Sequence, residues 1–445
     1  MKIRDVVMGA NASVYHKLNI RMIKGVAYPR TEEQVVNAVR LAREQGIDVT
    51  PKGGGSGLSG ACTGGNRERI MISSLQMKEV LSISKDQRYA DVQAGATPDE
   101  VNEVLQPIGM KFWVAPSSRD IATVGGLLST DGGGNDTWVN GTMRDNTLRA
   151  KMVLYDGRRI SVDNKGVRSD DPGLEAELTK AKMTLSDVAG SHGTLGFITE
   201  VRIAIRPATT ENLIGGVIHY PDSNEMGQSV GLMIEKQLPI RYGEAIAFTH
   251  EDVKQDLTPP MLIVELPEVE EPGLKSLADF ERMDAKMVSK LKDIRLKLPK
   301  RNPKVGLQMA IFEDYGFYGR SLASMQNGLN EIDALLKKHG FAPFAKYGHA
   351  PSKWYMGDNS PTYGVILHSR EIRPQDKTGK DIFRTVQDLV ELCDRLKVTP
   401  KPEHKWPYSD SVKNTRLLEL RKAIGSGFNQ FIFDPQCNDV LSTMV

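Results

Sequence analysis

The sequence contains few cysteines, and they are scattered. Cys62, Cys393 and Cys437 are the only three in 445 residues, and no two of them form a CxxC pair. This spacing supports neither a disulfide framework nor an iron–sulfur or zinc-ribbon site. We therefore expect a reducing compartment, the cytoplasm being the simplest.

A dominant charge and long apolar runs are missing as well. Lys and Arg number 58 and Asp and Glu 56, so no global field attracts nucleic acid or anionic lipid. No stretch approaches the roughly 18 apolar residues of a membrane span, and residues 1–17 lack the apolar core of a signal peptide. We expect no nucleic-acid partner and no transmembrane span, so any work at a membrane would be by peripheral docking.

The remaining composition is that of a globular protein. Hydrophobic residues make up 40% of the chain and charged residues 26%, the usual proportions for a packed, water-facing fold. A chain of this length suits two or three domains with a large buried core.

Glycine is concentrated in residues 51–65, PKGGGSGLSGACTGG, where seven of fifteen residues are Gly. Backbone amides in such a loop can close on an anionic ligand. Gly55, Gly57 and Gly60 spell GxGxxG, but a dinucleotide fold needs a helix to open within that motif. Only residues 61–69 separate it from the next apolar run, which leaves no room for that helix. We favour a loop between two strands that wraps a diphosphate, over a Rossmann turn or a plain surface loop.

Two further glycine regions follow. Residues 116–134, PSSRDIATVGGLLSTDGGG, interleave glycines with hydroxyl side chains, and residues 190–196, GSHGTLG, form the third region. Each glycine taken singly is as well explained by a turn. Together, the three regions predict that one long ligand is followed over many ångströms.

The pattern of residues 31–46 predicts an amphipathic helix. Thr31 is the expected N-cap, Gln34 completes a capping box, and Gly46 ends the helix. The side chains expected on its buried face are Val35, Val36, Val39, Leu41 and Ala42.

The other expected elements mix strands and helices, so the predicted class is α+β. Strands are expected at 47–50, 69–73, 89–95, 148–155, 159–162, 197–206, 214–220, 262–266, 305–312 and 363–368. Helices are expected at 97–109, 223–237, 274–298, 322–339 and 413–425.

Several motifs together carry a resemblance. YPRTEEQV, PKGGGSGLSG, APSSRDIATVGGLLSTDGGG, TMRDN…VLYDG and GSHGTLGFITEVRIAIRP occur in this order within residues 28–207. This region resembles the FAD-binding domain of the p-cresol methylhydroxylase and vanillyl-alcohol oxidase type, and within it the D-lactate dehydrogenase and glycolate oxidase flavoprotein-subunit branch. The resemblance implies a two-subdomain FAD-binding domain at 1–207, an α+β cap that holds the substrate at 208–404, and a segment at 405–445 that returns to the FAD-binding domain.

The resemblance also implies which residues bind FAD. The first loop holds no His to tether the flavin, so we expect FAD to be non-covalent. Relatives usually carry Glu where this chain has His192, so that position is either close to phosphate or on the surface. The expected cofactor-binding residues are Pro51, Gly53, Gly54, Gly55, Ser56, Gly57, Ser59, Pro116, Ser117, Thr123, Gly125, Gly126, Ser129, Gly190, Gly193, Thr194, Leu195 and Ile198.

Two late fragments resemble the family's catalytic elements. An apolar strand ends at His368, and PEHKWPY carries Glu403 and His404. An imidazole can take a hydroxyl proton near neutral pH, so His404 or His368 is the expected base, against the alternatives of a surface and a core His. His368 and Glu403 suit zinc or manganese, but the family's further His falls near Gln375.

These residues predict oxidation of a small 2-hydroxy acid of the D-lactate or glycolate type, with a hydride passing to flavin N5. Electrons would then leave to oxygen, to a quinone, or to a separate protein such as an iron–sulfur subunit or an electron-transfer flavoprotein. The alternatives are a non-catalytic flavin-carrying subunit, a flavin oxidase of a sugar lactone or alditol, and an alkylglycerone-phosphate-type synthase. Candidates for holding the substrate carboxylate are Arg241, Arg370, Lys346, Lys353, Tyr347, Tyr355 and Tyr408.

Overall fold

The computed structural model describes most of the chain. The described residues are 22–57, 61–62, 67–116, 118–134, 136–208, 211–249, 260–297, 309–318, 322–349, 364–372, 379–396, 399–400 and 412–429. They fall into two compact units: the first draws on 1–133, 143–208 and 402–445, and the second on 134–142 and 209–401. Each unit is described by itself.

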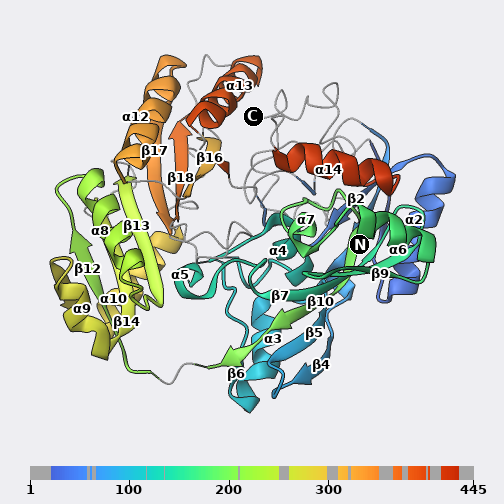
Figure 1. Cartoon of the computed structure of the whole chain (residues 1–445), viewed down its shortest axis with the longest axis horizontal. Coiled ribbons are helices and arrows are strands. Elements are labelled where there is room, and N and C mark those ends of the chain that lie inside the picture. Colours follow the sequence, from blue (N-terminus) through green and yellow to red (C-terminus); the bar gives the residue numbers. More distant parts are fainter. Residues whose placement is uncertain are drawn as a thin grey trace. The chain divides into compact units, whose positions relative to one another are not determined.

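The first unit is built on two larger sheets (Figure 1). A parallel sheet has the order β1-β3-β2, and a six-stranded antiparallel sheet has the order β4-β5-β10-β7-β8-β9, while β11 pairs with β6. The strands are β1 (Ile23–Ala27), β2 (Asp48–Lys52), β3 (Arg69–Ser73), β4 (Val80–Ser84), β5 (Tyr89–Gln93), β6 (Met110–Lys111), β7 (Thr147–Val153), β8 (Arg159–Asp163), β9 (Gly166–Ser169), β10 (Phe197–Ala204) and β11 (Arg206–Pro207). The helices are α2 (Glu32–Glu44), α3 (Pro98–Leu105), α4 (Val124–Thr130), α6 (Pro172–Lys180), α7 (Leu185–Val188) and α14 (Val412–Ala423).

Helix α2 forms where the sequence predicts it. The Thr31 hydroxyl accepts a hydrogen bond from the Gln34 amide at 3.3 Å, and Gly46 follows the helix with a φ of +65°. Two details of this helix prediction were wrong. The Gln34 side chain accepts from the Arg30 amide instead of closing a capping box on Thr31. Leu41 is 48% exposed, because the buried stripe of the helix passes through Val35, Val36, Val39 and Ala42 without including it.

Strands β2 and β3 lie side by side and parallel, with Asp48 opposite Arg69. The chain between them holds the first glycine region, and its described residues form no helix. The expectation of a loop between two strands is therefore correct for that part of the region.

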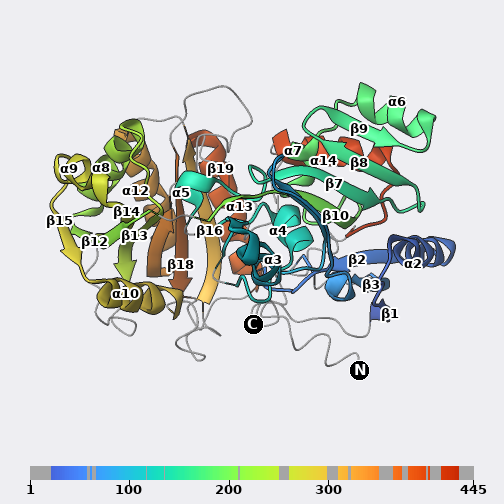
Figure 2. The ribbon, with the colours of Figure 1, turned by 90° about the horizontal axis from the view of Figure 1, so that it is seen from below.

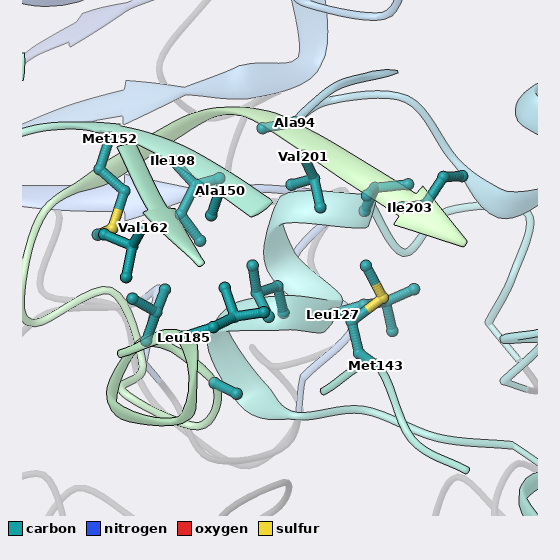
Figure 3. Packing of buried hydrophobic residues seen from close by; sticks show 14 of the residues in the cluster. Ala94, Leu127, Met143, Ala150, Met152, Val162, Leu185, Ile198, Val201 and Ile203 are labelled. Atoms are coloured by element: carbon teal, nitrogen blue, oxygen red, sulfur yellow. The ribbon is translucent and has the colours of Figure 1, made fainter. Parts of the chain in front are cut away.

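A large core lies under the six-stranded sheet, against α4. Figure 3 shows Val201 and Ile203 of β10 on one side and Leu127 of α4 with Met143 on the other. Alternate residues of β10, Phe197, Thr199, Val201 and Ile203, are buried together with Ile205 just after it. This packing fixes α4, and with it the second glycine region, against the sheet.

The second unit is an eight-stranded antiparallel sheet with helices packed on it. Its order is β15-β12-β14-β13-β17-β18-β16-β19, and Figure 2 shows α8 and α12 above the strands and α10 below. The strands are β12 (Leu213–His219), β13 (Tyr242–Thr249), β14 (Met261–Pro267), β15 (Phe280–Met283), β16 (Met309–Tyr318), β17 (Ala342–His349), β18 (Gly364–Ile372) and β19 (Thr399–Pro400). The helices are α5 (Thr137–Asn140), α8 (Ser223–Glu235), α9 (Glu271–Lys275), α10 (Ala285–Lys297), α12 (Leu322–Lys338) and α13 (Gly379–Leu396). The two units together confirm the α+β class.

The single helix predicted at 274–298 was wrong. The chain forms α9, then β15, then α10, because β15 pairs with β12 in the register Gly216↔Arg282. Asp284 then accepts a hydrogen bond from the Met287 amide at 2.8 Å and starts α10. The prediction also missed α13 entirely.

Asp91 is the centre of an ion-pair network on the six-stranded sheet. Its two carboxylate oxygens accept hydrogen bonds from the Arg202 guanidinium, each at 2.8 Å, and further bonds from Arg149 at 3.0 Å and the Ser82 hydroxyl at 2.9 Å. Burial on its own raises the pKa of Asp91. The hydrogen bonds from Arg202 and Ser82 and the charges of both arginines outweigh it and hold the pKa below its usual value.

A carboxyl whose folded-state pKa is lowered stabilises the fold above its unfolded pKa, and this stabilisation is lost as the pH falls through the folded value. Asp91→Asn should therefore lower the free energy of unfolding at about pH 7 by ~2 kcal/mol, since charged hydrogen bonds are lost. The deficit should shrink below about pH 4. Urea unfolding at both pH values measures this. Ser82→Ala is the control, because it keeps the charge and should show a smaller loss with little pH dependence.

Candidate functional site

The first glycine region lies in close contact with the second. A Cβ built on Gly54 would overlap the carbonyl oxygen of Ile121, and one on Gly53 would overlap the Thr123 hydroxyl. Only residues without side chains allow this approach. Residues 53–57 and 121–126 therefore meet within the first unit.

The first region has amides available for a ligand. Within the described part of the chain, the amides of residues 53–57 donate no hydrogen bond, and Gly55 has a φ of +71°. The Thr50 hydroxyl, fully buried in the middle of β2, likewise has no partner among the described residues. Free amides and an unsatisfied hydroxyl beside a loop without bulk fit the diphosphate of FAD.

The second glycine region is partly helical, which the sequence did not predict. Thr123 caps α4 by accepting from the Gly126 amide at 3.2 Å. The Gly125 amide donates to the carbonyl of Ala94 at 2.8 Å, and a Cβ at Gly125 would lie 2.6 Å from the Ala94 Cβ. The predicted residues Thr123, Gly125, Gly126 and Ser129 thus all belong to one short helix and its cap.

The third glycine region is bonded to the end of that helix. The amides of Gly190 and His192 donate to the carbonyls of Leu128 and Ser129 at 3.1 and 2.7 Å. A Cβ at Gly193 would lie 3.1 Å from Pro51 of the first region. His192 is 2% exposed with a φ of +53°, so the alternative of a surface His is wrong. All three predicted regions therefore converge.

Arg144 links the C-terminal end of α4 to the residue just before the third region through hydrogen bonds of its side chain. Its guanidinium donates to the Asp131 carboxylate at 3.1 Å and to the Ala189 carbonyl at 3.4 Å. Asp131, fully buried with a φ of +54°, is the C-cap of α4. The TMRDN motif thereby fixes the junction of the second and third regions.

The end of α14 and the segment after it pack onto the third region and onto β2, which leads into the first region. The Arg421 guanidinium donates to the carbonyls of Thr194 and Phe428, each at 2.6 Å, and the Ser426 hydroxyl donates to Thr194 at 2.7 Å. The Asn429 side chain donates to the His192 carbonyl at 2.8 Å, and its own amide donates to Val49 of β2 at 2.9 Å.

Buried charge accompanies this packing. Burial lowers the pKa of Arg421 to about 10 and that of Arg69 to about 10, with Asp48 opposing the shift in both. Burial raises the pKa of Asp48 against the charge of Arg67. Lys52, 4% exposed, donates to the Gly53 carbonyl at 3.3 Å. A cation is therefore present at the start of the first glycine region.

Sequence reasoning missed Lys52, Thr50 and Asn429. Lys52 stands inside the quoted motif and its charge was a usable signal. Asn429 reaches the site through contacts across more than 200 positions, for which the sequence carries no local signal. Two predicted cofactor residues, Ser59 and Ser117, lie outside the described residues.

Of the residues predicted to be catalytic, only His368 lies among the described residues. His368 lies on β18, where its backbone is in register with Tyr347 on β17 and Asp314 on β16. Glu403 and His404 lie outside the described residues, as do Lys353, Tyr355 and Tyr408.

One candidate for the substrate carboxylate is already engaged. Arg241 forms a forked ion pair with Glu211, at 2.8 to 3.0 Å, which satisfies the guanidinium. Among the described residues no group of three or more His, Cys, Asp or Glu could hold a metal ion. The predicted metal pair includes Glu403, so it stays a prediction.

Residues 23–163 match the family described as FAD binding domain. This part of the chain is an FAD-binding domain. The match covers the first two glycine regions, and it confirms both the resemblance seen in the sequence and FAD as the cofactor.

Several curated relatives are named D-lactate or D-2-hydroxyglutarate dehydrogenase. D-lactate dehydrogenase of Archaeoglobus fulgidus is 31% identical over 215 residues, 48% of this chain and 46% of that protein. D-2-hydroxyglutarate dehydrogenase of Pseudomonas putida is 31% identical over 173 residues, 38% of this chain and 16% of that protein. The matches thus span less than half the length of these relatives.

A solved structure is similar over nearly the whole chain. Alkyldihydroxyacetonephosphate synthase matches 91% of this chain and 76% of its own, with a TM-score of 0.64 and 14% identity. This likeness confirms the fold. In the part of the chain that the structure describes, no helix is both long and apolar enough to span a membrane.

Proposed function

We propose that this protein oxidises a small 2-hydroxy acid, of the D-lactate or glycolate type, to the 2-oxo acid. The proposal rests on one observation above all: an FAD-binding domain whose curated relatives are named D-lactate and D-2-hydroxyglutarate dehydrogenases. Converging glycine turns that fit a diphosphate support the same chemistry. Residues 1–207 would bind FAD, 208–404 the substrate, and 405–445 would return to the FAD-binding domain.

Different residues of the chain would bind FAD, hold the substrate and accept its proton. The three glycine regions would hold FAD, with Lys52 beside the first, and bound FAD supplies a hydride acceptor at N5. His404 would take the hydroxyl proton of the substrate while the hydride leaves its C2 carbon, so that a proton and a hydride are removed together. Arg370 or Lys346 would hold the substrate carboxylate. His368 and Glu403 would orient the hydroxyl, with a zinc or manganese ion if one binds.

The two electrons would pass on to a separate acceptor. A quinone, an iron–sulfur subunit or an electron-transfer flavoprotein would each serve, because the three scattered cysteines provide no cluster motif of the chain's own.

A second candidate is a flavin-carrying subunit without its own substrate site. One observation favours it: Gln375 stands where the resemblance implies a His of the metal set. Such a subunit would bind FAD through the same three regions and relay electrons within an assembly.

An anaerobic titration separates the two. The purified protein, reconstituted with FAD, should show the visible absorbance of oxidised flavin. Addition of D-lactate, glycolate or D-2-hydroxyglutarate without oxygen should bleach that absorbance for at least one of them, since the hydride ends on the flavin.

For D-lactate and D-2-hydroxyglutarate the control is the L-enantiomer, which presents its C2 hydrogen to the opposite side and should not bleach the flavin; for glycolate, which is achiral, the control is acetate, which has no hydroxyl group to oxidise. Alditols and sugar lactones test the oxidase alternative. A yellow protein that dithionite bleaches but no 2-hydroxy acid does would contradict the proposed oxidation and favour the relay.

A further inference from the structure

Residues 416–429 form several hydrogen bonds and an ion pair with the third glycine region and the helix before it, and none of these contacts has been given a function so far. We call Arg416, Arg421, Ser426 and Asn429 the C-terminal clamp. Arg416 on α14 forms a forked ion pair, at 3.0 and 3.2 Å, with Asp187 on α7, just before the region. The other three bond the carbonyls of Thr194 and His192. Figure 1 shows α14 beside α6 and α7 in this unit.

The clamp is also part of the sheet that carries the first region. The Val49 amide donates to the Gly427 carbonyl at 3.1 Å, and the Asn429 amide donates back to Val49 at 2.9 Å. Phe428 between them is fully buried with Val35, Val36 and Val49. The clamp therefore joins the first and third glycine regions, which lie far apart in the sequence.

Asn429 has the geometry of a positioning residue. It is 1% exposed and adopts a φ of +44°, which few side chains tolerate. Its side-chain nitrogen donates to His192, while its side-chain oxygen has no partner among the described residues. A buried acceptor left open beside a ligand turn is expected where a bound group completes the hydrogen bonding.

We propose that the C-terminal clamp, through Asn429 and Arg416, sets the affinity for FAD by holding the third glycine region against the first. The inference rests on FAD binding by these regions and not on the proposed oxidation. Linkage makes it reciprocal: if docking of the clamp tightens FAD binding by some factor, bound FAD must oppose opening of the clamp by the same factor.

Asn429→Gly is the sharpest variant, because glycine keeps the positive φ while removing the side chain. It should weaken FAD binding about fivefold or more, the scale of one hydrogen bond to a buried carbonyl. FAD fluorescence or calorimetric titration of the full chain measures this. Arg416→Ala should act in the same direction and Arg416→Lys should rescue it only partly, since Lys cannot form the fork; these variants also serve if Asn429→Gly does not fold.

Two matched controls separate positioning from general stability. Lys182→Gly also places glycine at a positive φ in the first unit, and Asn102→Ala removes another side-chain amide, the one that donates to the Phe112 carbonyl at 3.0 Å and accepts from the Phe112 amide at 2.8 Å. Both should leave FAD affinity within about twofold, below the scale of one lost hydrogen bond. An Asn429→Gly affinity within the same range, or an equal loss in Asn102→Ala, would overturn the proposal.

Hydrogen exchange of the backbone amides gives a second test, because FAD would not protect the clamp selectively if the clamp only stabilised the fold. FAD should slow exchange of the amides at 424–429 more than those of 159–169 on β8 and β9, because the clamp is bonded to the third region, whereas no bond from β8 or β9 to that region is seen among the described residues. Equal slowing of both would count against the proposal. Failure of wild-type protein to bind FAD would instead defeat the assignment of the site, so the two failures are distinguishable.

Discussion

Gly54→Ala is expected to abolish FAD binding and to destabilise the protein even without FAD. The new methyl group would overlap the carbonyl oxygen of Ile121. That oxygen belongs to the backbone just before α4, so relief requires the first and second glycine regions to separate. Overpacking of this kind costs about 1–3 kcal/mol or more, and the separation would spread the amides that face the ligand.

The neighbouring glycines give a graded control. A Cβ at Gly53 would overlap only the Thr123 side chain, and one at Gly57 would meet nothing within 4 Å. The free energy of unfolding of the FAD-free protein should therefore fall most for Gly54→Ala, less for Gly53→Ala and hardly at all for Gly57→Ala.

Chemical unfolding of the three FAD-free variants, followed by FAD titration of those that fold, tests this order. An alanine at position 54 that leaves both the unfolding midpoint and the FAD affinity at wild-type values would show that the two regions do not meet as described.

Local signals in the sequence were read correctly where the structure depends on neighbours in the chain. The cap at Thr31 formed as the spacing requires. Helix α3 and strand β10 lie within the ranges expected for a helix at 97–109 and a strand at 197–206. In each case the partner lies within a few residues, so sequence periodicity contains the whole signal.

The errors occurred where partners are distant. Residues 280–283 are compatible with a helix, but pairing with β12 makes them a strand. The glycines of α4 indicated a loop, although the helix forms because a bare backbone at Gly125 packs on Ala94. His192 lies in a polar stretch that would suit the surface, yet hydrogen bonds from Asn429 and to Ser129 satisfy its backbone inside the fold. Tertiary contacts override local preference in all three.

The proposed FAD site could be outlined from the sequence because it is made of motifs. The three glycine regions could be named from the sequence, and the structure brings them together. Lys52 carried a usable signal, its charge within the first motif. Thr50 and the clamp could not be singled out from the sequence, since only burial and long-range contacts bring them to these regions. The candidates for binding and deprotonating the substrate are single side chains that belong to no motif. The sequence alone therefore names these candidates but does not predict how they are arranged around a substrate.

His404→Ala should separate chemistry from cofactor binding. The variant should keep FAD, because position 404 is not among the residues expected to bind the cofactor, while reduction of the flavin by the active 2-hydroxy acid should slow by about 10²-fold or more, the usual loss for a general base. Stopped-flow bleaching under anaerobic conditions measures the step directly.

The pH dependence distinguishes a base from a residue that only orients the substrate. In wild-type protein the reduction rate should rise as an imidazole loses its proton, near its ordinary pKa of about 6.5, and this rise should be absent from His404→Ala. His368→Ala is the matched comparison, since it removes the other candidate imidazole. If the rise persists in His404→Ala and disappears in His368→Ala, the proton goes to the β18 histidine; if both variants reduce the flavin at the wild-type rate, neither imidazole is the base.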